Sequence, residues 1–122
     1  GASRAVTNEK AHRVAAGLRC AQEATMATYI VLANYTEQGI RSIKDTTKRA
    51  DAVREMAKKF GATAREFFWT MGRYDVVVIF DAPDDAAMTA LSLSIASLGN
   101  VRTQTLRAFS RDEVSGMLGK LA

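Results

Sequence analysis

Six polar and aromatic residues stand at the ends of predicted strands or in a turn between two of them: Asn34, Tyr35, Trp69, Arg73, Tyr74 and Asp75. A rigid scaffold often holds binding residues at such positions. Aromatic rings offer contact area, and an arginine offers the planar donor fork that carboxylates favour. We therefore predict that these residues bind a small, mainly apolar ligand with one anionic or polar end, without turnover.

A structural interpretation competes at most of these positions. Residues 72–75 (GRYD) are typical of a tight turn, in which Gly72 supplies a positive φ. Asp75 is then expected to accept hydrogen bonds from amides of the turn, and Trp69 to belong to the core or to an interface. Arg73 has the weakest structural reason, since a turn rarely requires an arginine. It either meets a ligand or pairs with an acid on a partner.

Histidine and cysteine are absent from residues 26–122. This absence excludes a cysteine nucleophile, a serine–histidine pair, a histidine-bound haem and the usual zinc sites within that region. The chain also lacks the glycine-rich fingerprint of dinucleotide-binding folds and the phosphate loop of nucleotide triphosphate sites. We therefore expect no cofactor and no metal, and the catalytic residues, if any, are unknown.

The first 25 residues differ from the rest and are interpreted as a leader, followed by one domain over residues 26–122. A chain of 122 residues suits one domain with one core. The leader opens with the letters GAS, which resemble a cloning scar, and Met26 is interpreted as the natural start. Residues 1–25 are thus expected to be a tag or a translated upstream segment, helical or disordered. The competing interpretation is a genuine N-terminal helix capped by Asn8.

The single cysteine, Cys20, has no partner for an internal disulfide, which fits a cytoplasmic protein. No apolar run approaches the roughly 18 to 20 residues that span a bilayer, so a membrane is not an expected partner. The net charge of +4 is distributed over alternating acidic and basic residues, as along 41–59. Nucleic acid is not expected either, because no one-sign stripe with interleaved aromatics occurs.

The hydrophobic pattern predicts the order β-α-β-β-α-β, followed by one more helix. Strands are expected at 28–35, 63–71, 75–81 and 101–109, and helices at 38–60, from 83 to 98 and after 110. The first helix is expected to divide near Asp45, with a threonine capping its second piece. Ser110 and Glu113 predict a capping box for the last helix. The apolar residues of that helix are expected to face inward; they are Val114, Met117, Leu118 and Leu121.

This order predicts an α+β fold, the ferredoxin-like βαββαβ sandwich with an extra C-terminal helix. Helices then cover one face of the sheet, yet the strand Val76–Phe80 is apolar at every position. A sheet with one wet face would alternate apolar and polar residues. We therefore expect a second copy of the chain to cover the other face, either that of Val76, Val78 and Phe80 or that of Val77 and Ile79, forming a dimeric α/β barrel.

Several ordered segments resemble the GYD-domain family of small bacterial proteins. They are "YIVLANYTEQGI", "EFFWTM" with the following "GRYD", "VVVIFDAPDDAAM" and "GNVRTQTLRAF", and they extend from Met26 to about Leu121. The resemblance implies a dimeric α/β barrel rather than a particular activity. A more distant similarity connects the chain to the ligand-sensing domain of feast/famine regulators, whose DNA-binding helix-turn-helix is absent here.

Two classes of function remain open from the sequence. The first is an oligomeric, non-catalytic module that binds or senses a small molecule. The second is a cofactor-independent monooxygenase or isomerase, in which a Tyr, Asn or Asp in an apolar cavity moves a proton. A purely structural assembly unit cannot be separated from the first class by sequence.

Overall fold

The computed structural model describes residues 26–121. The leader and its competing N-terminal helix lie outside the described residues. In chain order the elements are β1 (Ala27–Tyr35), α2 (Glu37–Arg41), a short 3₁₀ helix (Ile43–Asp45), α3 (Thr46–Lys59), β2 (Thr63–Trp69), β3 (Val76–Ala82), α4 (Asp85–Ser97), β4 (Val101–Ala108) and α5 (Arg111–Leu118). No helix in this part of the chain has the length and apolarity needed to cross a membrane.

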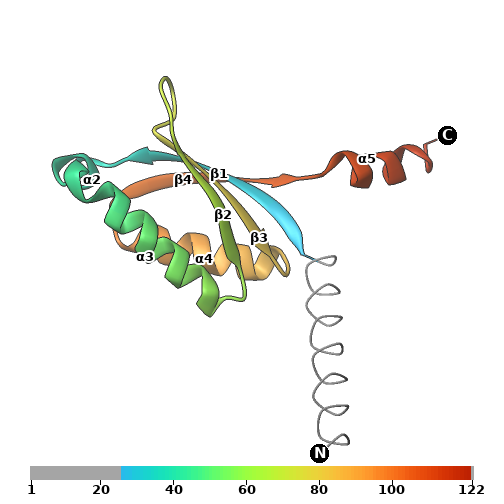
Figure 1. The fold of residues 1–122 in the computed structure, drawn as a ribbon, viewed down its shortest axis with the longest axis horizontal. Helices are drawn as coiled ribbons and strands as arrows, with labels where there is room; N and C mark the ends of the chain where they lie inside the picture. Colours follow the sequence, from blue (N-terminus) through green and yellow to red (C-terminus); the bar gives the residue numbers. More distant parts are fainter. Residues whose placement is uncertain (1–25, 122) are drawn as a thin grey trace, which may run out of the picture.

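The four strands form one antiparallel sheet in the order β2-β3-β1-β4. Helices α3 and α4 lie together on one side of this sheet, and α5 extends beyond the end of β4 (Figure 1). The strand order and the single helix layer are those of a ferredoxin-like fold, so the predicted fold class is confirmed.

The core lies between the sheet and its helix layer. Strand β3 alternates strictly, with Val76, Val78, Phe80 and Ala82 buried and the residues between them partly exposed. Val31 of β1 pairs with Val78, and Phe80 is fully buried. From α4, Met88, Leu91 and Ile95 pack into the same cluster. The helix layer therefore covers the Val76–Val78–Phe80 face.

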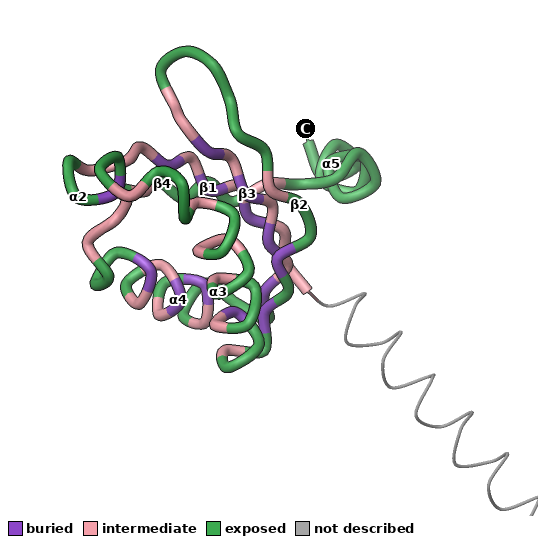
Figure 2. Tube along the Cα trace, turned by 60° about the vertical axis from the view of Figure 1, so that its left-hand side comes forward, coloured by how far each residue is buried: buried purple, intermediate pink, exposed green. Residues whose placement is uncertain are grey.

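The opposite face of the sheet, here called the open face, is also apolar. It carries Ile30 and Leu32 from β1, which pair with Ile79 and Val77 of β3. At its margins, Phe68 of β2 is 49% exposed. Within residues 26–121 no helix covers this face, since α3 and α4 lie behind the other one (Figures 1 and 2). Of the two faces that could receive a partner, the structure leaves only this one free.

The first helical segment is divided, as predicted, but the expected threonine cap is wrong. Asp45 occupies the N-cap position of α3 and makes no side-chain capping bond there. Thr46 begins the helix instead, and its hydroxyl faces Tyr35 and Trp69. A hydrogen-bonding threonine does cap a helix nearby, because Thr36 accepts from the Gly39 amide at the start of α2.

Helix α5 has the predicted capping box but not the predicted inward face. Ser110 accepts from the Glu113 amide, and Glu113 accepts from the Ser110 amide, both at 3.1 Å. None of the α5 residues is buried, and Figure 2 shows the whole helix as exposed and apart from α3 and α4. The reason is positional: α5 follows β4 outward, so no other element within residues 26–121 lies against it.

The β2–β3 connection is a protruding loop whose ends are tied together. The Thr70 amide donates to the Asp75 carbonyl at 2.9 Å, and the Thr70 hydroxyl bonds the Tyr74 carbonyl at 2.6 Å. Gly72 has φ +95°, the conformation that the turn interpretation predicted. Glycine is therefore required at position 72 because the backbone there has a positive φ.

Gly72→Val is expected to lower the free energy of unfolding by about 1 kcal/mol or more, because a β-branched residue is strained at positive φ. A Cβ at this position would meet no atom within 4 Å, so backbone strain alone would cause the loss. Urea denaturation measures it. Gly72→Asn is the matched control and should lose less, since asparagine tolerates positive φ. Equal stability of the valine variant and the original protein would contradict the assignment.

Candidate functional site

An apolar cavity of about 120 Å³ lies between the sheet and helix α3. Its walls come from the helix-covered side of all four strands and from α3 and α4. The apolar lining includes Val31, Ala50, Val53, Phe67 and Val78. The polar lining is small and consists of Tyr35, Thr46, Arg49, Trp69, Asn100 and Thr103. Such a combination of apolar walls and a few polar groups is typical of small-molecule sites.

Three side chains from three different elements form a hydrogen-bonded cluster at this cavity. The hydroxyl groups of Tyr35 and Thr46 lie 2.6 Å apart. The indole Nε1 of Trp69 donates toward both, at 3.1 Å to Tyr35 Oη and 3.0 Å to Thr46 Oγ1. Trp69 is 45% exposed, so this cluster connects the cavity with solvent. We call it the Tyr35–Thr46–Trp69 cluster.

Arg49 lies beside the cluster and holds the short α2 segment to α3. Its guanidinium donates to the Ser42 carbonyl and hydroxyl and to the Gly39 carbonyl, at 2.7 to 3.1 Å. The guanidinium carbon also lies 6.0 Å from the centre of the Tyr35 ring, within the range of a cation–π contact. A positive charge therefore lines an otherwise apolar cavity.

The approach of α2 to β4 sets the position of Asn100 in the lining. The Thr36 amide donates to the Asn100 carbonyl at 3.0 Å. A Cβ added at Gly39 would lie only 2.0 Å from that carbonyl oxygen, so only glycine fits there. Sequence reasoning did not single out Thr46, Arg49 or Asn100. Tertiary packing brings these three residues to the cavity, and no sequence motif links them to Tyr35 or Trp69.

The structure brings together only part of the predicted site. Tyr35 and Trp69 share the cluster, and Asp75 contacts Tyr35 through its backbone, accepting from the Tyr35 amide at 2.9 Å. The expectation that Asp75 bonds amides of the turn is therefore wrong. Strand β1 continues past the end of β3, which leaves the Tyr35 amide without a ladder partner, and the carboxylate takes that place.

The other three predicted residues do not reach the cavity. Asn34 alternates with Tyr35 along β1 and so belongs to the open face, in register with Arg102. The Tyr74 hydroxyl donates to Gln104 Oε1 at 3.2 Å, also on that face. Arg73 is exposed in the protruding loop. The predicted set is thus divided between the cavity, the open face and the loop.

A second, wider groove of about 490 Å³ lies between α4 and β4. Its lining mixes hydroxyl groups with one acid and one base, Asp85 and Arg107. The Tyr29 hydroxyl donates to Asp85 Oδ1 at 2.5 Å, and Ser92 bonds Thr105 at 3.2 Å. Its polar groups therefore bond largely to one another.

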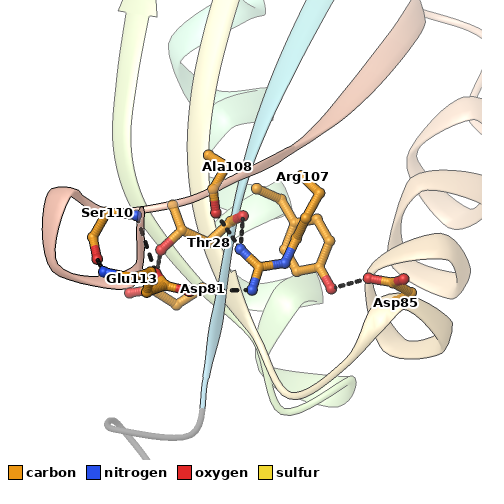
Figure 3. Close-up of polar contacts among 8 residues, drawn as sticks. Thr28, Asp81, Asp85, Arg107, Ala108, Ser110 and Glu113 are labelled. Carbon is orange, nitrogen blue, oxygen red and sulfur yellow. Dashed lines mark hydrogen bonds and ion pairs between the residues drawn. The ribbon is translucent and has the colours of Figure 1, made fainter. Parts of the chain in front are cut away.

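Arg107 holds the start of α5 to the sheet (Figure 3). It donates to the backbone carbonyls of Thr28 and Ala108 and pairs with Glu113 at 3.5 Å. Its guanidinium also lies over the Tyr29 and Phe109 rings, at 5.6 and 4.3 Å. These contacts set the direction in which the chain leaves β4.

Burial, and then the hydrogen bond to Asp85, raise the pKa of Tyr29 to about 12. Hydrogen bonds from Ser110, together with Arg107, lower the pKa of Glu113.

Within residues 26–121 no group of three or more His, Cys, Asp or Glu side chains is placed to hold a metal ion.

Residues 29–118 match the protein family described as the GYD domain. The chain belongs to the GYD-domain family. The match includes all four strands except the first two residues of β1, and it spans both the cavity and the loop at 72–75. The resemblance to the GYD-domain family seen in the sequence is therefore confirmed.

A curated relative of this GYD-domain chain comes from Thermus thermophilus. It is named "Glutamine synthetase and cystathionine beta-lyase binding protein", and it is 33% identical over 84 residues. The aligned part covers 68% of this chain and 88% of the relative. No solved structure matches the chain significantly.

The raised pKa of Tyr29 predicts a late titration step. The folded protein keeps the phenol proton above pH 10, where the unfolded chain releases it, so the stabilisation is complete below about pH 10 and is lost as pH rises toward about 12. A titration of tyrosinate absorbance should resolve one of the three tyrosines near pH 12, and Tyr29→Phe should remove that step. The control Tyr74→Phe should keep it. The absence of a step near pH 12, or a step that survives in Tyr29→Phe, would contradict the assignment.

Proposed function

We propose that this GYD-domain chain is a small, homo-oligomeric, non-catalytic module that binds a small, mainly apolar molecule with one polar end. The observation that carries the proposal is the apolar cavity next to the Tyr35–Thr46–Trp69 cluster. Two of the residues predicted to bind a ligand, Tyr35 and Trp69, lie there. Arg49, which lines the cavity, takes the ligand-binding role that was predicted for Arg73 from the sequence.

The cavity volume limits the size of the ligand. A cavity of about 150 Å³ in an apolar protein interior accepts benzene. At about 120 Å³, this one accepts a group no larger than a small ring or a short branched chain. The Tyr35 and Thr46 hydroxyls are the nearest groups for a polar end, and Arg49 supplies positive charge for an anionic one.

The lining favours binding over catalysis. Proton transfer needs a group whose pKa lies near the working pH, usually a histidine, a carboxylate or a lysine. The residues that line the cavity include no such side chain: their only ionisable groups are the Tyr35 phenol and the Arg49 guanidinium. The alternative of a cofactor-independent monooxygenase or isomerase would need its acid or base from outside the described lining.

Self-association through the open face is the second part of the proposal. Ile30, Leu32, Val77 and Ile79 present a flat apolar surface that a second copy can bury sheet against sheet. Asn34, Tyr74 and Gln104 would then lie inside the dimer, and Arg73 would stand at its rim. We further propose a cytoplasmic location.

A protein partner is a second candidate function, favoured by the relative that is named for binding glutamine synthetase and cystathionine beta-lyase. The loop at 70–75 is a suitable contact, because Met71 at its tip is 98% exposed. Titrating the two purified enzymes onto the immobilised protein decides this candidate. Saturable binding that Met71→Asp weakens, while Leu93→Asp on α4 does not, would support it, and the absence of binding to both enzymes would end it.

The ligand proposal predicts a fluorescence and stability response to benzene, phenol and benzoate. Trp69 is the single tryptophan of the chain, so its emission reports on the cavity directly. Bound probes should shift this emission and raise the melting temperature. Ala50→Leu, which fills the cavity, should abolish both effects. Thr46→Val should weaken phenol about 3- to 10-fold, the worth of one hydrogen bond, and leave benzene unchanged.

Thr63→Val, the same substitution at an exposed strand position, serves as the control. Probe binding that persists in Ala50→Leu would move the site elsewhere, and the absence of any response would remove the proposal. Oxygen consumption or product formation with a bound probe would favour the enzyme class instead.

A further inference from the structure

Helix α5 presents an apolar stripe that nothing within residues 26–121 covers. Val114, Met117 and Leu118 recur at i, i+3 and i+4, the spacing of one helix face, and Leu121 lies three residues after the helix ends. All four side chains are exposed, Leu118 at 57%. In both overall views α5 stands apart from α3 and α4 (Figures 1 and 2). The stripe is therefore an unpartnered face.

The start of α5 is fixed in place rather than loosely attached. The capping box satisfies two backbone amides, and Glu113 also pairs with Arg107 on the last strand. Arg107 in turn is bonded to the Thr28 carbonyl of the central strand β1 (Figure 3). A helix of eight residues has little stability of its own in water. A capped and anchored helix of this length is therefore expected to pack against another surface, and residues 26–121 of the same chain do not supply one.

The open face alone is small for a stable dimer. Four strands about 4.8 Å apart, each with about seven residues at about 3.3 Å, offer roughly 450 Å² per copy. A standard interface needs about 800 Å² per partner. Segments next to that face can add to the buried area. Strand β4 leads directly from Leu106, which lies on the open face and is 40% exposed, to α5.

We propose that the apolar stripe of α5 packs on a second copy of this chain, as an arm that continues the sheet-to-sheet interface. Each copy then both extends an arm and receives one, as two-fold symmetry requires. The stripe packs on the partner copy and not on another protein. The reason is that the area of the stripe continues an interface that begins on the adjoining strand β4. This inference rests on the proposed self-association through the open face.

Sedimentation equilibrium of the full chain tests the arm with substitutions that the single chain tolerates. Leu118→Glu should raise the dimer dissociation constant at least about 10-fold, since it places a charge in the interface. Gly116→Glu adds the same charge on the opposite side of α5, where a Cβ meets no atom within 4 Å, and should not weaken the dimer. Gly116→Ala should tighten the dimer up to about 5-fold by favouring the helix, because a Cβ there meets no atom within 4 Å.

The outcomes separate the arm from the dimer on which it rests. If Leu118→Glu and Gly116→Glu leave the dimer equally stable, the arm is wrong and the open-face interface still stands. A chain that is monomeric at micromolar concentration before any substitution overturns both. Circular dichroism and melting temperature check folding, which should not change because Leu118 is exposed in the single chain.

Discussion

A single helix layer covers a sheet whose central strands are apolar on both faces, and the remaining structure depends on this imbalance. On the covered side, Val31, Val78 and Phe80 pack beneath α3 and α4 and form the core. On the other side, Leu32 and Val77 are paired in register, and no helix of the described part of the chain lies above them. Burial of apolar area is the main favourable term in folding and association, so the second face favours a second copy.

The same central strand connects the proposed activities. Tyr35 closes β1, its hydroxyl belongs to the cluster at the cavity, and its amide is held by Asp75 at the base of the protruding loop. Residues of β1 that alternate with Tyr35, such as Asn34, face the open side. A ligand at the cluster and a partner on the open face would therefore act on opposite sides of one strand.

The features that the sequence predicted are those governed by neighbours along the chain. The capping box at Ser110 and the positive φ of Gly72 are local, and both are confirmed. The cluster depended on Thr46, a helix-start residue that meets Trp69 only through the packing of α3 on the sheet. The inward face expected for α5 was wrong because periodicity marks an apolar stripe but does not identify which chain covers it.

Contacts between two copies can be observed directly in a mixture of isotope-labelled and unlabelled protein, by isotope-filtered nuclear Overhauser spectroscopy. The account predicts intermolecular contacts from the methyl groups of Ile30, Leu32, Val77 and Ile79. It predicts none from the methyls of Val31 and Val78, which the helix layer of the same chain covers. Intermolecular contacts that avoid the open face, or a sample without any, would contradict the claim that this face is an interface between copies.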